Sequence, residues 1–590
     1  MEFFGERRVR DELRTGVRYP EGITKRIFQG SVEPGSREHY GIDFETTDVP
    51  FFDRKGKNKL KAGGHPRFAR VLLSTGSNIR EAWVHDSAEA LPSPLDTFIF
   101  HNLSFDGLVG IQNAWWTLDA LWEKMPNCTA LMSKVLRNDR PVSLKYLAVS
   151  KLGEFKITNY NEVDKTKHAD FIEYAKNDAI YTAKLFPIFE DELNQSLQWD
   201  LYRKVELPFA LLNTECELNG MLVDSERLAS VLSETKNKIS VIEKGITSEK
   251  INFNSPKQIK RFLFGDLNLP LTYLRGKIST SKTSIKSLNH PAAEMLLKRQ
   301  EAVGLKKQLD SIARFTDVLT NRIHPYINTL GADTGRCTSS NPNLQNISKD
   351  SVVRSLFVAT PGYKMIVLDF GQIEPRVLAH FLGEGPFRDL FDSGQDFYEH
   401  LANSVFTSLG TNVPARAIAK QAILGVMYGL ESRTMAANLG CTVAEAEAFL
   451  KSFHDHFPEI SIFKKAALDR MRLNGYAEGL FNRRRFIDGL DSENEYERAQ
   501  AEREAFNALI QGSAATIFKY KLVKLREQLP KCVRFLLHVH DEVIMEAPEE
   551  MADEILKVSK QLLEEPLAWF SVPLKVGGGV GSNWSQAKNA

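Results

Sequence analysis

Two short apolar segments, far apart in the chain, each lead to an aspartate. Residues 39–44 (HYGIDF) contain Asp43, and residues 365–368 (MIVL) come directly before Asp369. Short apolar runs of this kind are typical of buried strands, and helical patterns follow both of them. At 590 residues the chain also exceeds the size of a single hydrophobic core. We therefore expect several domains, with two α/β regions separated by a largely helical one.

The composition is typical of a soluble globular protein, with 43% hydrophobic and 26% charged residues. The sequence contains no run of 18 apolar residues, and its first residues lack the layout of a signal peptide. The five cysteines are scattered singly, which argues against a disulfide framework or a zinc site. These features predict a cytoplasmic protein without a membrane segment.

Positive charge is concentrated in residues 236–314, although the net charge of the whole chain is only +1. This stretch holds 16 Lys and Arg against 6 Asp and Glu. Clustered cations can neutralise phosphates on a nucleic acid, but they can equally form a solvated helical face. Charge alone favours the solvated face.

The expected elements alternate between strands and helices. Residues 1–36 have no sustained periodicity and are interpreted as an N-terminal arm. Residues 254–258 (NSPKQ) are typical of a capped helix start with proline in the first turn. The remaining expected elements are strands at 69–74, 97–100 and 533–539, and helical segments at 171–189, 208–314 and 386–473.

One constellation of acids lies in the first α/β region. Asp43 and Glu45 are two residues apart, so they share one side of a strand. Asp106 follows the strand at 97–100, and Tyr174 and Asp178 lie one turn apart on the expected helix. Four converging carboxylates would repel one another unless divalent cations lay between them. Two metals about 4 Å apart are the known arrangement for phosphodiester cleavage, with a nearby tyrosine able to orient the attacking water.

These segments resemble the three motifs of the DEDDy 3′–5′ exonucleases: Asp-x-Glu, the Asn102 to Asp106 segment, and Tyr-x₃-Asp. The resemblance implies a Mg²⁺ pair held by Asp43, Glu45, Asp106 and Asp178, with Asn102 and Phe105 contacting DNA. A degenerate exonuclease kept only for structure is the alternative. Two further acid pairs share the first spacing without such neighbours, Asp224-x-Glu226 and Asp491-x-Glu493.

A second constellation lies in the C-terminal half. Asp369 ends an expected strand and precedes a helix that has Pro375 in its first turn. Residues 535–547 are typical of a hairpin with Asp541 at its polar tip. Between them, Arg416, Lys420 and Leu424 lie four residues apart and form one stripe on a helix. Two cationic side chains can bind the phosphates of a nucleoside triphosphate, and an apolar side chain beside them can contact its sugar or base.

An amphipathic helix with a solvated basic face is the alternative for this stripe. We count Gly425 and Gly429 against that alternative, because both weaken the helix without an evident role in folding. Capping or turn aspartates are the corresponding alternative for Asp369 and Asp541 taken singly.

Together these segments resemble motifs A, B and C of the family A DNA polymerases, and further segments extend the resemblance over residues 37–590. The further segments are 334–346 (TGRCTSSNPNLQN), 503–515 (REAFNALIQGSAA) and 572–584. The implied fold is α/β multidomain, an RNase H-like exonuclease followed by a right-hand polymerase. The implied domains are exonuclease 37–195, thumb 196–322, palm 323–388 and 505–590, and fingers 389–504.

The resemblance also implies roles for individual residues. Asp369 and Asp541, with the main chain of Phe370, would hold two Mg²⁺ ions, for which Mn²⁺ could substitute. Lys420 would also donate a proton to the leaving pyrophosphate, and Glu374 would exclude ribonucleotides. The residues expected at the dNTP are Arg416, Lys420, Leu424, Tyr428, Glu374, Gln372 and Tyr398. The residues expected at DNA are Arg336, Arg354, Arg503, Asn507, Gln511 and His540, and the basic stretch 236–314 becomes a thumb surface that grips the duplex.

Some positions depart from the family pattern. Leu424 replaces a Phe or Tyr, which predicts discrimination against dideoxynucleotides, and Tyr398 replaces a phosphate-contacting His. Gly371, Pro375 and His538 are also unusual. The sequence predicts no 5′-nuclease domain and no thioredoxin-binding insertion in the thumb, a layout similar to phage or organelle replicative enzymes. Expected partners are primer–template DNA and dNTPs, with a helicase or primase as further candidates for a monomeric enzyme.

Three other functions remain as alternatives. A single-subunit RNA polymerase would have a similar palm, but Glu374 and the exonuclease motifs oppose it. A nuclease with a vestigial polymerase region would not extend primers. A DNA-binding module without enzymatic activity would leave both acidic sets unexplained.

Overall fold

The computed structural model describes most of the chain from Tyr40 onward. The described residues are 40–46, 71–76, 82–85, 98–112, 116–155, 157, 168–246, 251–274, 276–348, 351–391, 396–405 and 413–590. The expected N-terminal arm, residues 1–36, lies outside them. For β1, which carries Asp43 and Glu45, only the strand itself is described.

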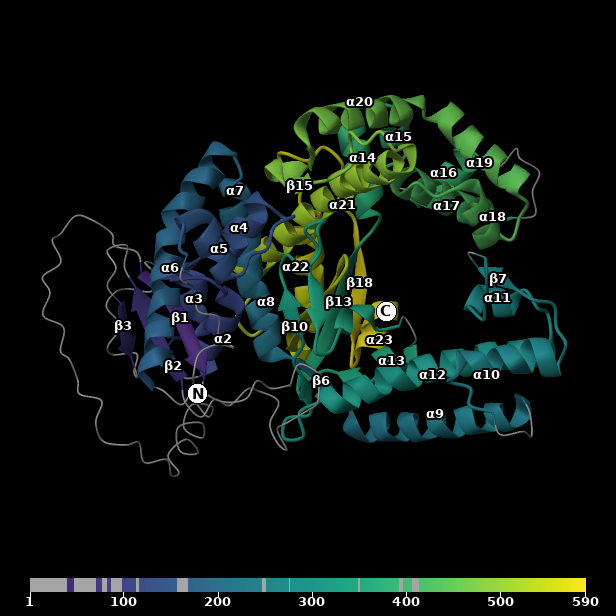
Figure 1. The fold of residues 1–590 in the computed structure, drawn as a ribbon, viewed down its shortest axis with the longest axis horizontal. Coiled ribbons are helices and arrows are strands. Elements are labelled where there is room, and N and C mark those ends of the chain that lie inside the picture. The colour runs from purple at the N-terminus through teal and green to yellow at the C-terminus, as the bar shows by residue number, and fades with distance from the viewer. Residues whose placement is uncertain are drawn as a thin grey trace, which may run out of the picture. The chain divides into compact units, whose positions relative to one another are not determined.

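A five-stranded sheet organises the first α/β region, the expected exonuclease (Figure 1). Its strands, in spatial order, are β3 (Ala82–His85), β2 (Val71–Gly76), β1 (Tyr40–Thr46), β4 (Phe98–Phe100) and β5 (Asn127–Cys128). β4 pairs in parallel with β1 and with β5, whereas β2 pairs in antiparallel with β1 and with β3. The expected strands at 39–44, 69–74 and 97–100 are confirmed within two residues at each end.

Helices cover this sheet. They are α2 (Leu103–Gln112), α3 (Leu118–Lys124), α4 (Thr129–Leu136), α5 (Leu144–Leu152) and α6 (His168–Gln195). α6 packs against β1, β2 and β3 as well as α4 and α5. It extends the expected helix at 171–189 at both ends. β4 is completely buried between these layers, as expected for a central strand of an α/β unit.

The expected helical span at 208–314 is confirmed. Its first part is α7 (Trp199–Leu201), η3 (Tyr202–Glu206) and α8 (Leu207–Asn219), followed by β6 (Met221–Val223). Next come α9 (Ser225–Ile246), α10 (Pro256–Lys260), η4 (Arg261–Asp266), the hairpin β7 (Tyr273–Leu274) and β8 (Lys277–Ile278), α11 (Lys282–Lys286) and α12 (Pro291–Phe315). α9 and α12 lie side by side (Figure 1). The Ser255 hydroxyl caps α10, as the sequence predicted.

Two sheets form the centre of the polymerase region. One contains β12 (Phe357–Val358), β6 and β9 (Arg322–Ile323). The other is antiparallel and runs β16 (Arg534–Val539), β17 (Glu542–Pro548), β13 (Tyr363–Phe370) and β18 (Val576–Gly581). β18 approaches β13 so closely that a Cβ at Gly578 would lie 1.9 Å from the Val367 carbonyl oxygen. α22 (Ala552–Glu564) and α23 (Trp584–Asn589) pack against β13 and β18.

One further α-helix, α13 (Ser351–Arg354), comes just before β13 in the chain. The α-helices that follow β13 are α14 (Ile373–Leu382), α15 (Pro386–Asp389), α16 (Phe397–Val405), α17 (Ala415–Tyr428), α18 (Ser432–Leu439), α19 (Val443–His456), α20 (Pro458–Asn474) and α21 (Glu495–Gln528). The expected helical span at 386–473 is confirmed, as are the strands at 365–368 and 533–539. Between α20 and α21 the hairpin β14 (Tyr476–Glu478) and β15 (Arg484–Phe486) turns the chain.

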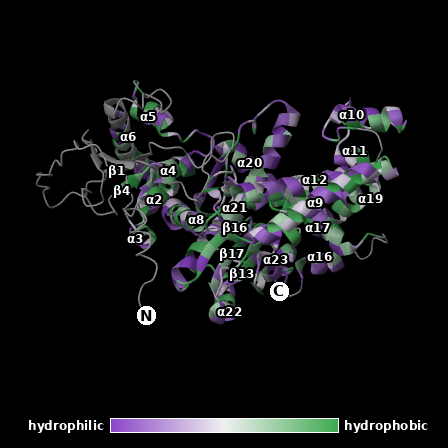
Figure 2. Ribbon diagram, turned by 90° about the horizontal axis from the view of Figure 1, so that it is seen from below, coloured by the Kyte–Doolittle hydropathy of each residue, from purple (hydrophilic) through white to green (hydrophobic). Residues whose placement is uncertain are grey.

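Hydropathy follows this arrangement. Figure 2 shows mostly hydrophobic residues on β13, β16 and β17, and many hydrophilic residues on α10 and α12. One large core joins the antiparallel sheet, α14, α17 and α21, and it also includes Phe209 and Leu212 of α8. No helix among the described residues has the length and apolar character needed to span a bilayer.

Candidate active sites

Asp369 and Asp541 lie at the same end of the antiparallel sheet. β13 and β17 pair in a register that sets Asp369 opposite Glu542, the residue after Asp541. The Phe370 amide donates a hydrogen bond to the Asp541 carbonyl oxygen at 3.1 Å. The hairpin predicted at 535–547 is therefore confirmed, with His540 and Asp541 forming its two-residue tip.

The electrostatics of this pair are those of a site that favours cations. Burial, and then the negative charge of Asp369, raise the pKa of Asp541 to about 6. Lys588, on α23, lies within 2.6 Å of a carboxylate oxygen of Asp369 and within 2.6 Å of one of Glu542. The sequence did not single out Lys588 or Glu542.

Glu542 is a buried support for this end of the sheet. The Trp584 indole nitrogen donates to its carboxylate at 2.6 Å, and Arg354 lies 3.6 Å from the same oxygen. Arg354 also stacks over the Trp584 ring, 4.5 Å from its centre. Arg354, expected at DNA, is thus 7% exposed and engaged with Glu542. In the sequence, this cluster was indicated by Trp584, which lies in the segment 572–584 that resembles the family A polymerases.

Residues next to the two aspartates adopt the left-handed conformation. Gln372 has a φ of 50° and caps α14, and His540 has a φ of 57°. Such conformations are uncommon for residues other than glycine and gather at functional sites. In the first turn of α14, the nearly buried carboxylate of Glu374 forms an ion pair with Arg336. Arg336 thereby holds the expected ribose-excluding side chain.

The stripe on α17 faces solvent. Arg416 and Lys420 are exposed and Leu424 is half-buried, while the opposite face, with Ile418 and Ile423, is buried. Arg416 lies 3.3 Å from a carboxylate oxygen of Asp396. Burial alone would raise the pKa of Asp396, but the hydrogen bond from Arg416 lowers it overall.

The prediction that Gly429 has no role in folding was wrong. Gly429 ends α17 in the left-handed conformation, with a φ of 64°, and its amide donates to the Gly425 carbonyl oxygen. A Cβ there would also lie 2.4 Å from the Arg503 side chain. The glycine therefore has a folding role as a helix C-cap, and it does not count against an amphipathic helix.

Tyr398, on α16, lies beside the stripe. The Arg416 guanidinium is 5.5 Å from the centre of the Tyr398 ring, and burial raises the pKa of the phenol. The side chain of Tyr428 lies outside the described residues, so its expected place near the template base stays a prediction.

α21 presents a polar face made of Arg503, Asn507 and Gln511, which follow one another at four-residue intervals. All three are half-buried. The Asn507 Oδ1 atom is buried and has no hydrogen-bond partner among the described residues. His540 is exposed at the hairpin tip. A small pocket near the tip is lined by Arg336, Gln345, Ile373, Ala514, Ala515, Phe518, Lys519, His538, His540 and Asp541, among others.

His538 has a structural position. Its Nε2 atom is 2.8 Å from the Asn213 amide oxygen, and it packs against Phe209. Burial, and then the charge of Lys519, lower the pKa of His538 to about 3, so the ring is neutral.

In the exonuclease region two of the four expected acids are described in full. Asp106, on α2, and Asp178, on α6, are both buried. The Asp106 carboxylate accepts a hydrogen bond from the Asn102 amide at 3.3 Å. β1, which carries Asp43 and Glu45, pairs in parallel with β4, directly before α2, and packs against α6. Asn102 and Phe105 are both exposed beside this region.

Lys145, on α5, is a further residue of this site that the sequence did not single out. It forms an ion pair with Asp178, and its ammonium lies 4.0 Å from the centre of the Tyr174 ring. Burial raises the pKa of Asp178, and the charge of Lys145 opposes that rise.

A match to a family model identifies the family of the C-terminal part of the chain. Residues 225–586 match the model described as DNA polymerase family A.

The chain belongs to DNA polymerase family A.

Residues 38–194 of this family A chain match a second model, described as a 3′-5′ exonuclease. The expected order, an α/β exonuclease domain followed by a polymerase region, is thereby confirmed. The match also separates the chain from the single-subunit RNA polymerases.

This family A chain has bacterial relatives. It is 34% identical to the thermostable DNA polymerase I of Thermus aquaticus over 71% of its own length, and 32% identical to DNA polymerase I of Borreliella burgdorferi over 78%. The chain spans about half the length of these curated relatives, 52% and 53%. A solved structure of the POL domain of Pol1 from M. smegmatis, in complex with DNA primer-template and dNTP, superimposes with a TM-score of 0.79. That match has 26% identity and covers 93% of this chain and 96% of the other.

The polymerase site offers two carboxylates that are suited to binding divalent metal ions. Among the described residues no group of three or more His, Cys, Asp and Glu side chains is arranged to hold a metal ion. The negative charge of Asp369 nevertheless contributes to the raised pKa of Asp541, and a divalent cation would relieve that repulsion.

Proposed function

We propose that the chain extends a DNA primer along a template from dNTPs and removes 3′-terminal nucleotides by hydrolysis at a second site. The register that brings Asp369 and Asp541 to one end of the sheet carries the proposal for synthesis. Asp106 and Asp178, buried on two helices that both pack against β1, support the proposal for proofreading.

Asp369, Asp541 and the Phe370 main chain are the proposed ligands of two Mg²⁺ ions, with Mn²⁺ as a substitute. Bound metal would activate the primer 3′-hydroxyl and stabilise the charge of the departing pyrophosphate. Asp541 supplies a carboxylate whose ionised form gains from a neighbouring cation because it is largely buried.

The proposed triphosphate contacts are Arg416 and Lys420, whose exposure on α17 leaves them accessible to a ligand. Lys420 is also the proposed proton donor to pyrophosphate. Arg416 would break its ion pair with Asp396 and bind a phosphate oxygen instead. The remaining proposed nucleotide contacts are Leu424, Tyr428, Glu374, Gln372 and Tyr398, and the ion pair with Arg336 supports a fixed position for Glu374.

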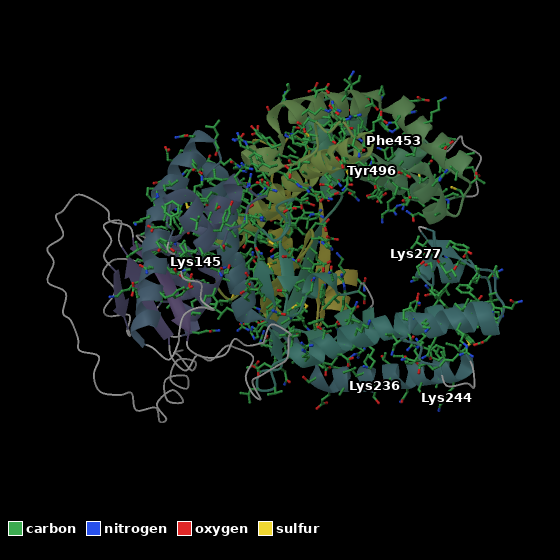
Figure 3. All side chains as sticks on the ribbon, viewed as in Figure 1. Lys145, Lys236, Lys244, Lys277, Phe453 and Tyr496 are labelled. Atoms are coloured by element: carbon green, nitrogen blue, oxygen red, sulfur yellow. The ribbon has the colours of Figure 1, made fainter. Side chains whose placement is uncertain are left out.

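DNA contacts are proposed on two surfaces. Arg503, Asn507 and Gln511 share one face of α21, and the buried, unpartnered oxygen of Asn507 supports a ligand there. Arg336, Arg354 and His540 are the further proposed contacts near the hairpin tip. In the thumb, Lys236, Lys244 and Lys277 are exposed, whereas Arg299 is buried in an ion pair with Glu243 (Figure 3). The thumb, palm and fingers boundaries given above remain proposals.

At the proofreading site, Asp43, Glu45, Asp106 and Asp178 are the proposed ligands of a second Mg²⁺ pair. Tyr174 would orient the attacking water, and Asn102 and Phe105 would contact the strand end. The exposure of Asn102 and Phe105 beside buried Asp106 supports this assignment.

Source and partners are further parts of the proposal. The chain would act as a monomer in the cytoplasm, on primer–template DNA and dNTPs such as those in the complex of the M. smegmatis relative. A replicative helicase or primase is the further partner proposed. The relatives are bacterial polymerases and give no support to a phage or organellar origin.

A labelled primer annealed to a longer template and incubated with Mg²⁺ tests both activities. We expect lengthening with dNTPs and shortening without them. Asp369→Ala should abolish lengthening alone, and Asp43→Ala or Asp178→Ala should abolish shortening alone. Asp491→Asn, at an exposed acid, is the matched control and should affect neither. A single substitution that removed both activities from a folded protein would contradict the two-site assignment.

A further inference from the structure

A lysine lies inside the acidic exonuclease site. We propose that Lys145 is a positioning residue of the exonuclease, and that its ammonium fixes both the Asp178 carboxylate and the Tyr174 ring for metal binding. The inference rests on the proposed function, because Asp178 is there a proposed metal ligand.

The position of Lys145 is set by the start of a helix. The Ser143 hydroxyl caps α5 by accepting from the Tyr146 amide, so Lys145 lies in the first turn. From there its side chain reaches α6, where it forms the ion pair with Asp178. The Lys145 side chain is 18% exposed and that of Asp178 only 6%, which distinguishes this contact from an ordinary surface pair.

The carboxylate of Asp178 needs a cation where it lies. A buried carboxylate is unfavourable in its charged form unless it is paired, and a metal ligand must be charged. The ion pair with Lys145 therefore holds the buried Asp178 carboxylate in one orientation on α6.

The same ammonium also holds the tyrosine. Its position 4.0 Å from the centre of the Tyr174 ring is within the range of a cation–π contact. Tyr174 precedes Asp178 by one turn of α6, so one side chain restrains two neighbouring groups of the proposed site. Partners that orient metal ligands in this way typically contribute 10- to 100-fold to metal affinity or activity.

A second lysine on the same helix provides a matched control. Lys151 forms an ion pair with Glu192 of α6, and its ammonium lies 5.8 Å from the centre of the Phe189 ring. Lys145 and Lys151 thus both join α5 to α6 through a carboxylate and an aromatic ring. Only Lys145 contacts proposed catalytic residues, so Lys151 reports the effect of losing a tie between α5 and α6 alone.

Manganese binding to the full chain tests the proposal. The background carries Asp369→Ala and Asp541→Ala, so that the exonuclease site dominates, and free Mn²⁺ is measured by electron paramagnetic resonance. We expect Lys145→Met to weaken Mn²⁺ binding by about 10- to 100-fold and to slow single-strand degradation to a similar extent. Lys145→Arg should recover most of both, and Lys151→Met should change neither. Primer extension by Lys145→Met with Asp369 and Asp541 intact should be normal, which reports on folding.

Several results would overturn the proposal. Unchanged Mn²⁺ affinity in Lys145→Met would show that Lys145 does not position a ligand, and tighter binding would make it a competitor of the metal. An equal loss in Lys151→Met would reduce Lys145 to a structural tie. Asp178→Asn distinguishes a failure of the proposed exonuclease site from a failure of the role given to Lys145. If Asp178→Asn retains Mn²⁺ binding and degradation, the proposed exonuclease site is wrong, and the role of Lys145 is wrong with it. If Asp178→Asn loses both and Lys145→Met loses neither, only the present inference fails.

Discussion

The amide of Phe370 donates a hydrogen bond to the carbonyl oxygen of Asp541 at 3.1 Å. This bond joins the last residue of β13 to the tip of the β16–β17 hairpin, and it continues the β13–β17 ladder beyond Asp369. Because the main chain fixes the two segments, Asp369 and Asp541 stay neighbours whether or not their charges are compensated. The sheet therefore holds two carboxylates together at a cost in stability.

That cost should depend on pH. Burial and the charge of Asp369 raise the pKa of Asp541 from 3.8 to about 6, so folding favours its protonated form. The resulting loss of folding stability is absent below pH 3.8 and grows between pH 3.8 and about 6. Above pH 6 it is complete and amounts to about 3 kcal/mol of the free energy of unfolding. In EDTA, Asp541→Asn should raise the free energy of unfolding by up to that amount at pH 8, and progressively less as the pH falls toward 4.

Urea denaturation across this pH range measures the effect. Asp491→Asn, at an exposed acid, should leave the free energy of unfolding nearly unchanged throughout. A gain from Asp541→Asn that was constant with pH would show that repacking, rather than the loss of a charge, causes it.

A buried ion triad ties η3 to the polymerase core. Glu206 is fully buried and pairs with Arg483 and, at 2.8 Å, with Lys519 of α21. Glu206→Ala would leave two buried cations without their partner, which costs about 3–5 kcal/mol for pairs of this kind. Thermal or urea unfolding of the variant should show this loss. Glu527→Ala, which removes an exposed partner of Lys524, should cost less than about 1 kcal/mol.

Leu424 should affect the choice between deoxy- and dideoxynucleotides. It is half-buried on the solvent-facing stripe of α17 and offers no hydroxyl toward the sugar of an incoming nucleotide. The native chain should therefore prefer dNTPs, and Leu424→Tyr should narrow that preference by supplying a hydroxyl. Single-nucleotide incorporation with each substrate measures the ratio. Leu424→Phe adds the ring alone, and an equal effect of Phe and Tyr would refute the role of the hydroxyl.

The sequence was informative where a local pattern determines a local structure. The Ser255 cap, the 535–547 hairpin and the α17 stripe each depend on residues within a few positions of one another, and all three were found. The helical pattern at 171–189 also located α6, and α12 lies inside the predicted helical span 208–314, whereas α21 lies outside the predicted helical segments.

Contacts between distant segments could not be predicted in this way. Lys588 and Asp369 are 219 positions apart, and Lys145 and Asp178 are 33 apart. No local signal distinguishes these lysines from the many exposed ones. β6 is only three residues long, too short for a period of two to be evident, although it pairs with both β9 and β12. Gly429 was misjudged because its role depends on the conformation at the end of α17.

Lys588 should affect the metal requirement of synthesis in the direction opposite to Lys145. The Asp369 side chain is 39% exposed, against 6% for Asp178, so Asp369 depends less on a partner to hold it in place and Lys588 chiefly competes with the metal for it. A partly exposed pair of this kind is worth up to about 1 kcal/mol, so Lys588→Met should lower the half-saturating Mg²⁺ concentration for primer extension by up to about fivefold. Glu542 should keep its place in the variant, because Trp584 and Arg354 still hold it. Lys560→Met is the control, since Lys560 donates to the Gly578 carbonyl oxygen beside the same sheet. A higher Mg²⁺ requirement in Lys588→Met would mean that Lys588 orients Asp369, and that exposure does not distinguish the two lysines.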